Sequence, residues 1–154
     1  MIRLFHPNDA ETLTDIYVRS VCEIGSRFYS PAQIDAWAGR TPSAEIWAEM
    51  MTDGRFCLVA IDDQDKARAF GDLEADGHID FLYAHPDVAG TGVVAVLYQE
   101  LEAEACRQGI ARLYVEASEA ARGFFQRQGF TLLHRRDFDV DGVAIHNYAM
   151  EKRL

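Results

Sequence analysis

The chain has few cysteines, and they follow no pattern. Its 154 residues include three, at positions 22, 57 and 106, an odd number at unrelated spacings. Neither a disulfide framework nor a Cys/His metal site fits such spacing, and no metal is expected. The sequence therefore predicts reduced cysteines in the core of a cytoplasmic protein.

Long apolar runs, repeats and linkers are also missing. No apolar stretch reaches the length of a membrane-spanning helix, and the first residues carry no signal-peptide pattern, so no membrane partner is expected. Without low-complexity tracts or a composition shift, residues 1–154 are predicted to form a single domain with its own core.

Basic residues are scarce. There are 15 Lys and Arg against 25 Asp and Glu, which gives a formal net charge of −10. Such a charge disfavours nucleic acid as the primary ligand. It favours a cationic substrate such as an amine, although solubility alone explains the charge equally well.

Residues 82–94, LYAHPDVAGTGVV, form the most informative segment of the chain. They combine a short apolar strand, a turn at Pro86, the triplet Gly90-Thr91-Gly92 and the start of a helix with apolar residues every four positions. Glycines let a ligand approach the backbone closely, and the first N–H groups of a helix are unpaired at the positive end of its dipole. The segment predicts a pyrophosphate cradle, though an unliganded tight turn explains it equally well.

Two other phosphate-binding motifs fit this segment less well. A Walker A loop needs Gly-Lys-Ser/Thr where the chain has Val93-Val94. A Rossmann fingerprint can use Ala95 as its third small residue and Glu116 as its acid, but that motif lies near the first strand of its domain. Here about half of the chain precedes the loop, which counts against a dinucleotide site.

A second motif follows the helix, which is predicted to end at Gly109. A strand over 111–117 leads into residues 118–130, SEAARGFFQRQGF. With both motifs in this order, the sequence resembles the GNAT superfamily of acyl-CoA-dependent N-acetyltransferases. That family has a Gln/Arg-x-x-Gly-x-Gly/Ala loop before a long helix, and later a short helix that ends in an aromatic-rich Gly-Phe turn. The resemblance spans the chain and is strongest over 78–131.

The resemblance implies acetyl-CoA as co-substrate, with the thioester carbonyl polarised by backbone N–H groups around Tyr83 and Ala84. The residues that it assigns to cofactor binding are Leu82, Tyr83, Ala84, Ala89, Gly90, Thr91, Gly92, Val93, Val94, Ser118, Phe124 and Phe125.

Four of these positions depart from the family pattern. Ala89 replaces Gln or Arg, Val94 replaces Gly or Ala, and Ser118 replaces an Asn that hydrogen-bonds the pantetheine arm. The cradle works through its backbone, so binding is expected to survive. Phe125 replaces the Tyr that is thought to protonate the leaving thiolate, and Phe has no proton to give.

Tyr148 is our first candidate for that missing general acid, with Tyr83, Tyr114 and solvent as alternatives. Core packing is the commoner role for each of these tyrosines. For the base that takes the proton of the amine, the family strand before the cradle suggests His78 and Asp80, which lie two residues apart and hence on one face.

An imidazole titrates near neutral pH and suits a base. An exposed turn position for His78 and a loop-anchoring hydrogen bond for Asp80 are the competing interpretations. Glu74 and Glu116, at neighbouring strand ends, are weaker candidates.

Residues 27–37 are rich in aromatics where the family builds its acceptor pocket. Tyr29 and Trp37 are therefore predicted to contact the substrate, a small-molecule or peptide amine, unless they pack in the core.

The predicted element order is β-α-α-α-β-β-β-α-β-α-β-β. It indicates an α/β fold with a GNAT-like mixed, mostly antiparallel twisted sheet and helices on both faces. Helix starts are predicted at an Asn8/Glu11 capping box, at Ser30-Pro31 and at Thr41-Pro42. Strands are predicted over 1–5, 55–61, 66–74, 78–84 and 111–117, with a closing hairpin of 130–140 and 143–152 around Asp141-Gly142.

Together these observations predict an N-acetyltransferase in which a primary amine attacks acetyl-CoA directly. A degenerate acyl-CoA sensor without catalysis is the first alternative, because of Ala89, Val94 and Phe125. An α/β protein that binds a different nucleotide is the second. A homodimer is left open.

Overall fold

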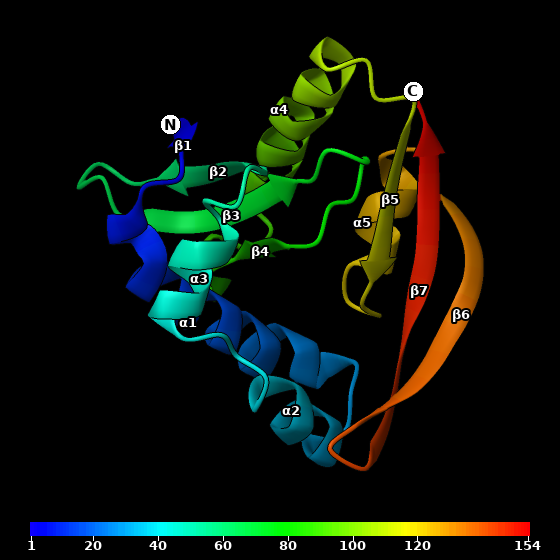
Figure 1. Cartoon of the computed structure of the whole chain (residues 1–154). Helices are drawn as coiled ribbons and strands as arrows, with labels where there is room; N and C mark the ends of the chain where they lie inside the picture. The colour runs from blue at the N-terminus through cyan, green and yellow to red at the C-terminus, as the bar shows by residue number, and fades with distance from the viewer.

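Two antiparallel sheets form the frame of the molecule, and the computed structural model describes all residues from 1 to 154 (Figure 1). The first sheet has the order β1-β2-β3-β4, with bounds Ile2–Leu4, Phe56–Ile61, Ala67–Leu73 and Leu82–Ala84. The second has the order β5-β7-β6, with bounds Arg112–Ala117, Val143–Arg153 and Thr131–Val140.

A single parallel bridge joins the two sheets. The backbone N–H of Tyr114 in β5 donates to the carbonyl of Gly77 at 3.1 Å. The backbone carbonyl of Tyr114 accepts a hydrogen bond from the N–H of Ile79, also at 3.1 Å. Beyond this point β4 and β5 diverge, and Figure 1 shows the sheets splayed apart. The splay leaves the cleft-facing edge of β4 without a partner strand.

A buried carboxylate explains why the sheets separate there. The N–H groups of Asp80 and Phe81 both donate to Asp72 Oδ1, at 2.9 and 2.8 Å. Consecutive N–H groups of a regular strand point to opposite sides, so turning both toward β3 breaks the strand geometry. The predicted strand over 78–84 is therefore wrong in extent, and only Leu82–Ala84 remains as β4.

The helices cover both faces of the first sheet, as predicted. They are α1, α2, α3, α4 and α5, with bounds Ala10–Arg19, Pro31–Ala38, Ala44–Met50, Val93–Arg107 and Arg122–Arg127. Helix α4 packs on β2, β3 and β4 from one side, while α1 and α3 pack on the other (Figure 1). A π-helical turn, Ser20–Ile24, continues α1 toward the cleft.

Two hydrophobic clusters hold this arrangement together. One contains Leu97 and Leu101 of α4 with Leu113 of β5, all fully buried, and it spans both sheets. The other surrounds the fully buried Trp47 of α3 and Phe70 of β3. The first cluster holds the two sheets together, because residues of α4 and of both sheets belong to it.

Local capping confirms one predicted helix start and corrects two. Helix α2 starts at Ser30-Pro31, as predicted. The Ser30 hydroxyl accepts a hydrogen bond from the backbone N–H of Gln33, and the Gln33 side-chain oxygen accepts one from the backbone N–H of Ser30. The predicted Asn8/Glu11 box is wrong: His6 and Asp9 form it, because a 3-10 turn, Pro7–Asp9, precedes α1. Helix α3 starts after Ser43, not at Thr41-Pro42, since the Ser43 hydroxyl accepts the N–H of Ile46.

The cysteines depart in part from their expected place. Cys57 of β2 is buried in the core, but Cys22 and Cys106 are exposed on helical surfaces, and all three are free thiols. The prediction of a core position, made from the usual burial of free cysteine, is therefore wrong for these two residues, because both lie on the outward sides of their helices. No helix in the structure has the length and apolar character that crossing a membrane requires.

Candidate active site

Two adjoining pockets occupy the cleft between the sheets. The first, of about 200 Å³, is lined by β4, β5, α2 and the β6–β7 hairpin. The second, of about 380 Å³, runs from the start of α4 to α5 and the π-helical turn. Six residues line both pockets: Trp37, Leu82, Tyr83, Ser118, Ala121 and Phe125. The pockets therefore meet at the end of β4.

The second pocket contains the predicted cradle. Gly90 and Gly92 have φ angles of 77° and 89°, a conformation that glycine adopts at no steric cost. A Cβ at either position meets no protein atom within 4 Å, so the space before the helix is open. The N–H groups of Gly92, Val93 and Val94 have no partner in the protein and are free to bind an anion.

Ten of the twelve predicted cofactor residues line this pocket: Leu82, Tyr83, Ala84, Ala89, Gly90, Gly92, Val94, Ser118, Phe124 and Phe125. Thr91 and Val93 do not line it; the Thr91 hydroxyl instead donates to the carbonyl of Val88 at 2.5 Å. Sequence analysis missed Ser20 and Ile24, because a π-helical turn, which often marks a functional site, leaves no signal in α-helical periodicity.

His78 is the first predicted base, but its surroundings keep it protonated. Its Nδ1 lies 3.0 Å from Glu74 Oε1 and its Nε2 lies 3.0 Å from Glu116 Oε1. Burial opposes the charge, but the two carboxylates outweigh it and raise the His78 pKa to about 9. At neutral pH His78 is thus an imidazolium with both nitrogens engaged, and it has no site left to accept a proton.

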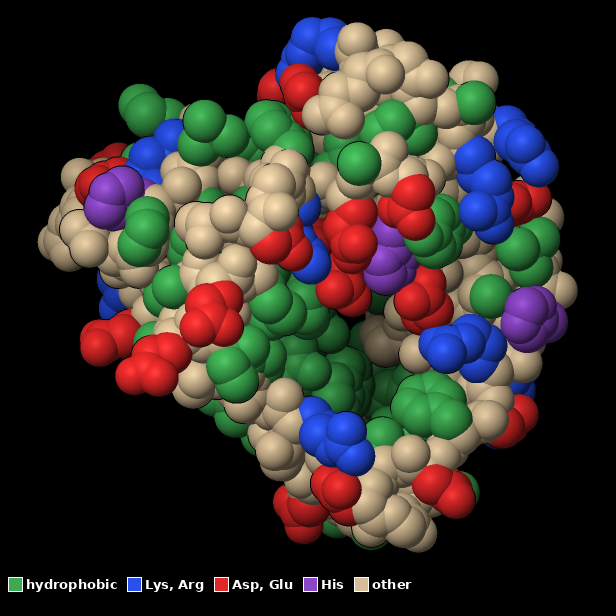
Figure 2. Space-filling model, in the orientation of Figure 1, with side chains coloured by type: hydrophobic (Ala, Val, Ile, Leu, Met, Phe, Trp, Pro, Cys, Tyr) green, Lys and Arg blue, Asp and Glu red, His purple; other side chains and the backbone are tan.

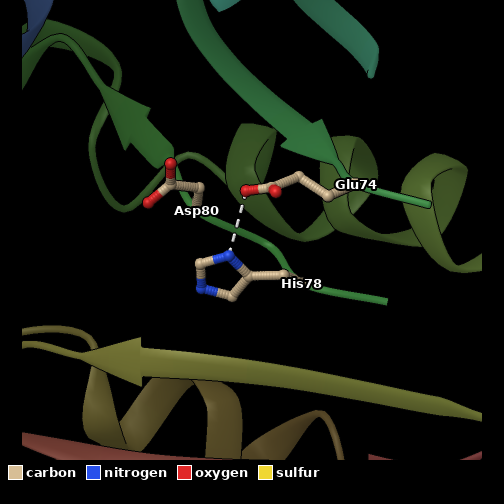
Figure 3. Close-up of side chains that lie close together, drawn as sticks. All are labelled: Glu74, His78 and Asp80. Atoms are coloured by element: carbon tan, nitrogen blue, oxygen red, sulfur yellow. Dashed lines mark hydrogen bonds and ion pairs between the residues drawn. The ribbon is translucent and has the colours of Figure 1, made fainter. Parts of the chain in front are cut away.

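Asp80 is the second predicted base, and it does line the first pocket. Figure 3 shows its carboxylate beside the Glu74–His78 pair. Burial raises the Asp80 pKa, and the attraction of His78 and of Arg55, whose Nη1 lies 3.4 Å away, offsets only part of this rise. The loop-anchoring role considered for Asp80 belongs to Asp72, which holds the backbone of Asp80 in place.

Arg55 and protonated His78 balance part of the negative charge here. The ligand atoms of Glu74, His78 and Asp80 lie within 4.8 Å of one another, a spacing that a metal site also has. In this cluster a guanidinium and an imidazolium already supply the positive charge: Arg55 Nη1 lies 2.6 Å from Asp72 Oδ2.

Tyr148 is the predicted acid, and it lines neither pocket. Its hydroxyl donates to Glu119 Oε2 at 2.7 Å, and this carboxylate raises the Tyr148 pKa. His146, which does line the first pocket, binds the same oxygen through Nε2 at 2.6 Å. Sequence analysis missed Glu119 and His146, because only the fold brings residues 27 positions apart together.

The two residues predicted to contact the acceptor lie close together in the structure. Tyr29 and Trp37 line the first pocket, with ring centroids 5.5 Å apart. The Tyr29 hydroxyl donates to the carbonyl of His146 and accepts the N–H of Glu119, each at 2.8 Å. Tyr29 therefore ties the segment before α2 to β7 across the cleft. Phe125, buried at the boundary of both pockets, is an apolar wall there.

His78 makes the stability of the protein depend on pH. A pKa raised from 6.5 to about 9 in the folded state gives stability that is complete below about pH 6.5 and is lost as the pH rises through about 9. Replacing His78 by Gln is expected to lower the free energy of unfolding by roughly 1–3 kcal/mol at pH 6, and by much less at pH 10.

Urea unfolding at both pH values measures this difference, with His134→Gln on the exposed face of β6 as the control. A His78→Gln effect of equal size at both values contradicts the charge assigned to His78.

Comparisons with known proteins identify the family. The model of the acetyltransferase (GNAT) domain matches residues 26–152. The uncharacterized N-acetyltransferase YafP of Escherichia coli is 30% identical over 150 residues, which cover 97% of this chain and 93% of that protein. The chain thus belongs to the GNAT acetyltransferases, and as a member of this family it is an acyl-CoA-dependent transferase.

Solved structures agree on the fold. A GCN5-related N-acetyltransferase from Rhodopseudomonas palustris superposes with a TM-score of 0.91 at 32% identity, over all of this chain and 95% of that one. The PaiA N-acetyltransferase of Thermoplasma acidophilum, solved with coenzyme A, has a TM-score of 0.80 at 21% identity, over all of this chain and 98% of that one.

Proposed function

We propose that this protein transfers the acetyl group of acetyl-CoA to a primary amine by direct attack, where the two pockets meet. The observation that carries the proposal is that an open phosphate cradle and a pocket holding a carboxylate share the boundary at Leu82, Ser118 and Phe125. Residues 1–154 act as one unit in it, since residues from both the first and the second half of the chain line each pocket.

The pyrophosphate binds the N–H groups at the start of α4, and the pantetheine arm follows the cleft toward Phe125. The free edge of β4 then polarises the thioester carbonyl. Phe81 and His85 donate their N–H groups to the β3 side, so strand alternation directs those of Leu82 and Ala84 into the cleft. These two donors stabilise the oxyanion of the tetrahedral intermediate.

Asp80 takes the proton of the amine. The nitrogen forms a bond to the carbonyl carbon, the proton passes from nitrogen to the Asp80 carboxylate, and the carbon–sulfur bond breaks with its electron pair on sulfur. The thiolate then takes up a proton, so the products are the amide and free CoA. His78 does not exchange the proton; its charge holds Glu74 and Glu116 and keeps the bridge between the sheets in place.

Release of free thiol tests the proposal. The protein with acetyl-CoA and a panel of primary amines is expected to release thiol in step with amide formation. Acetyl-CoA at ~100 times its dissociation constant adds ~2.7 kcal/mol of stability. Stabilisation without thiol release from any amine supports the alternative of a sensor, and absence of both overturns acetyl-CoA as the ligand.

Tyr148 remains our candidate for the proton that the thiolate receives, supported by its hydrogen bond to Glu119 beside the loop of Ser118. Tyr148→Phe removes only the hydroxyl, so kcat is expected to fall ~10²-fold while the melting temperature changes little. A Phe125→Tyr change in that variant places a hydroxyl at the pocket boundary and is expected to restore part of kcat. Normal turnover of Tyr148→Phe contradicts this role and assigns the proton to solvent or to another group.

We also propose that the reaction takes place in the cytoplasm, which the three free thiols support. No contact within the chain bears on a homodimer, and the proposal does not require one, because one copy supplies both pockets.

A further inference from the structure

The walls of the first pocket are flat and apolar. Aromatic rings line it from three directions: Tyr29 and Trp37 from the α2 side, Tyr83 from β4 and Phe138 from β6. Val140 and Ile145 of the closing hairpin complete the same surface. Figure 2 shows this region as a hollow with hydrophobic side chains inside it and acidic side chains gathered around a histidine at its upper edge. Such walls suit a ligand with a flat apolar body.

The charged groups of the pocket are of one sign. Asp80 and Glu116 line it, and no Lys or Arg does. The positive charges nearby, Arg55 and His78, also pair with Asp53, Asp72 and Glu74, so five carboxylates share two cations. The acidic edge therefore keeps an excess of negative charge that attracts an ammonium group.

Arg136 of β6 lies near the pocket but does not line it. Its Nη1 donates to Asn147 Oδ1 at 3.0 Å, and its guanidinium lies 5.5 Å from the centre of the Phe138 ring. After His78, it also lowers the Glu116 pKa by its charge. Because no Lys or Arg lines the pocket, a carboxylate next to the reacting nitrogen meets Asp80 and Glu116 on the pocket wall and no cation there.

On these grounds, and resting on the proposed function, we infer that the acceptor is a small arylalkylamine: a primary amine on a short chain, with an aromatic body and no carboxylate beside the nitrogen. The ammonium group is drawn to Asp80 and Glu116 and loses one proton to solvent to become the neutral amine. Asp80 then accepts the second proton when the nitrogen attacks the thioester, as in the proposed reaction. The ring lies between Trp37 and Phe138. Amino acids are excluded by charge, and short alkylamines leave the apolar walls uncovered.

Three amines that share the phenethylamine skeleton test the effect of a charge beside the nitrogen. Phenethylamine, phenylalanine and phenylalanine amide differ in what stands beside the nitrogen: hydrogen, carboxylate or a neutral amide. We expect kcat/KM to be at least ~10²-fold higher for phenethylamine than for phenylalanine, because like charges repel. Phenylalanine amide is expected to lie close to phenethylamine, which separates charge from size.

Ethylamine tests the apolar body, and kcat/KM for phenethylamine is expected to exceed its value by roughly 10–200-fold. Phe138→Ala should reduce this preference by raising the KM for phenethylamine, while kcat/KM for ethylamine should not change. Leu133→Ala, an exposed change on the same strand that lines neither pocket, is the control. Glu116→Gln removes one negative charge, so it should reduce the ratio of kcat/KM for phenethylamine to kcat/KM for phenylalanine.

The outcomes separate this inference from the proposed function. If kcat/KM for phenylalanine or for ethylamine equals that for phenethylamine, the acceptor class is wrong, while transfer to an amine stands. If no amine in the panel releases thiol, the proposed function itself fails. A preference for phenethylamine that Phe138→Ala does not change also overturns the assigned position of the ring.

Discussion

Replacing Gly92 by Val is expected to abolish acetyl-CoA binding, with a loss of more than ~10²-fold in affinity, while the protein stays folded. A Cβ at position 92 meets no protein atom within 4 Å, so its branches enter the open space where the pyrophosphate lies. The φ angle of 89° also strains a β-branched residue, at a cost of order 1–3 kcal/mol. The melting-temperature shift at millimolar acetyl-CoA measures the binding.

Gly109→Val is the matched control. Gly109 lies at the other end of α4, with a φ of 72° and no atom within 4 Å of its Cβ, so the variant carries a similar strain far from the cradle. It should lose stability and keep acetyl-CoA binding. Unchanged affinity in a folded Gly92→Val variant means that the phosphates bind elsewhere.

Replacing Asp80 by Asn is expected to reduce kcat by ~10²–10⁴-fold, the usual cost of losing a general base. An amide keeps the size of the side chain, so acetyl-CoA should stabilise the variant as it does the wild type. In the wild type the rate rises with pH through the Asp80 pKa, which burial has raised. This rise should disappear in the variant.

Asp139→Asn on β6, an exposed acid outside both pockets, controls for the lost charge. Steady-state rates between pH 5 and 9 with one amine provide the comparison. Near-full turnover of Asp80→Asn with an unmoved pH profile assigns the proton to water or to His146, which faces the same pocket.

Local chemistry made the cradle predictable from the sequence. Two glycines before an amphipathic helix require backbone conformations that only glycine adopts easily, and the helix supplies the unpaired N–H groups whatever surrounds it. The same holds for the Ser30-Pro31 helix start and for Gly109, whose left-handed conformation ends α4. These features depend on neighbours in sequence, so the sequence suffices.

The roles of the ionisable groups were not predictable in this way. His78 was expected to be a base because an isolated imidazole titrates near neutral pH, but Glu74 and Glu116 raise its pKa to about 9. Glu116 is 38 residues away and reaches His78 only through the bridge between the sheets. The shortened β4 has a similar cause, since the carboxylate that bends it comes from Asp72 on another strand.

The sequence by itself determined the order of the elements and the position of the glycine loop, because glycine conformation and apolar periodicity act over a few residues, while its two motifs indicated the family by resemblance. The tertiary structure alone decided which carboxylate is available in the pocket, which histidine is charged, and that Tyr148 binds Glu119 outside both pockets. Burial and charge act through space, so they depend on residues that meet only after the sheets and the helices have packed together.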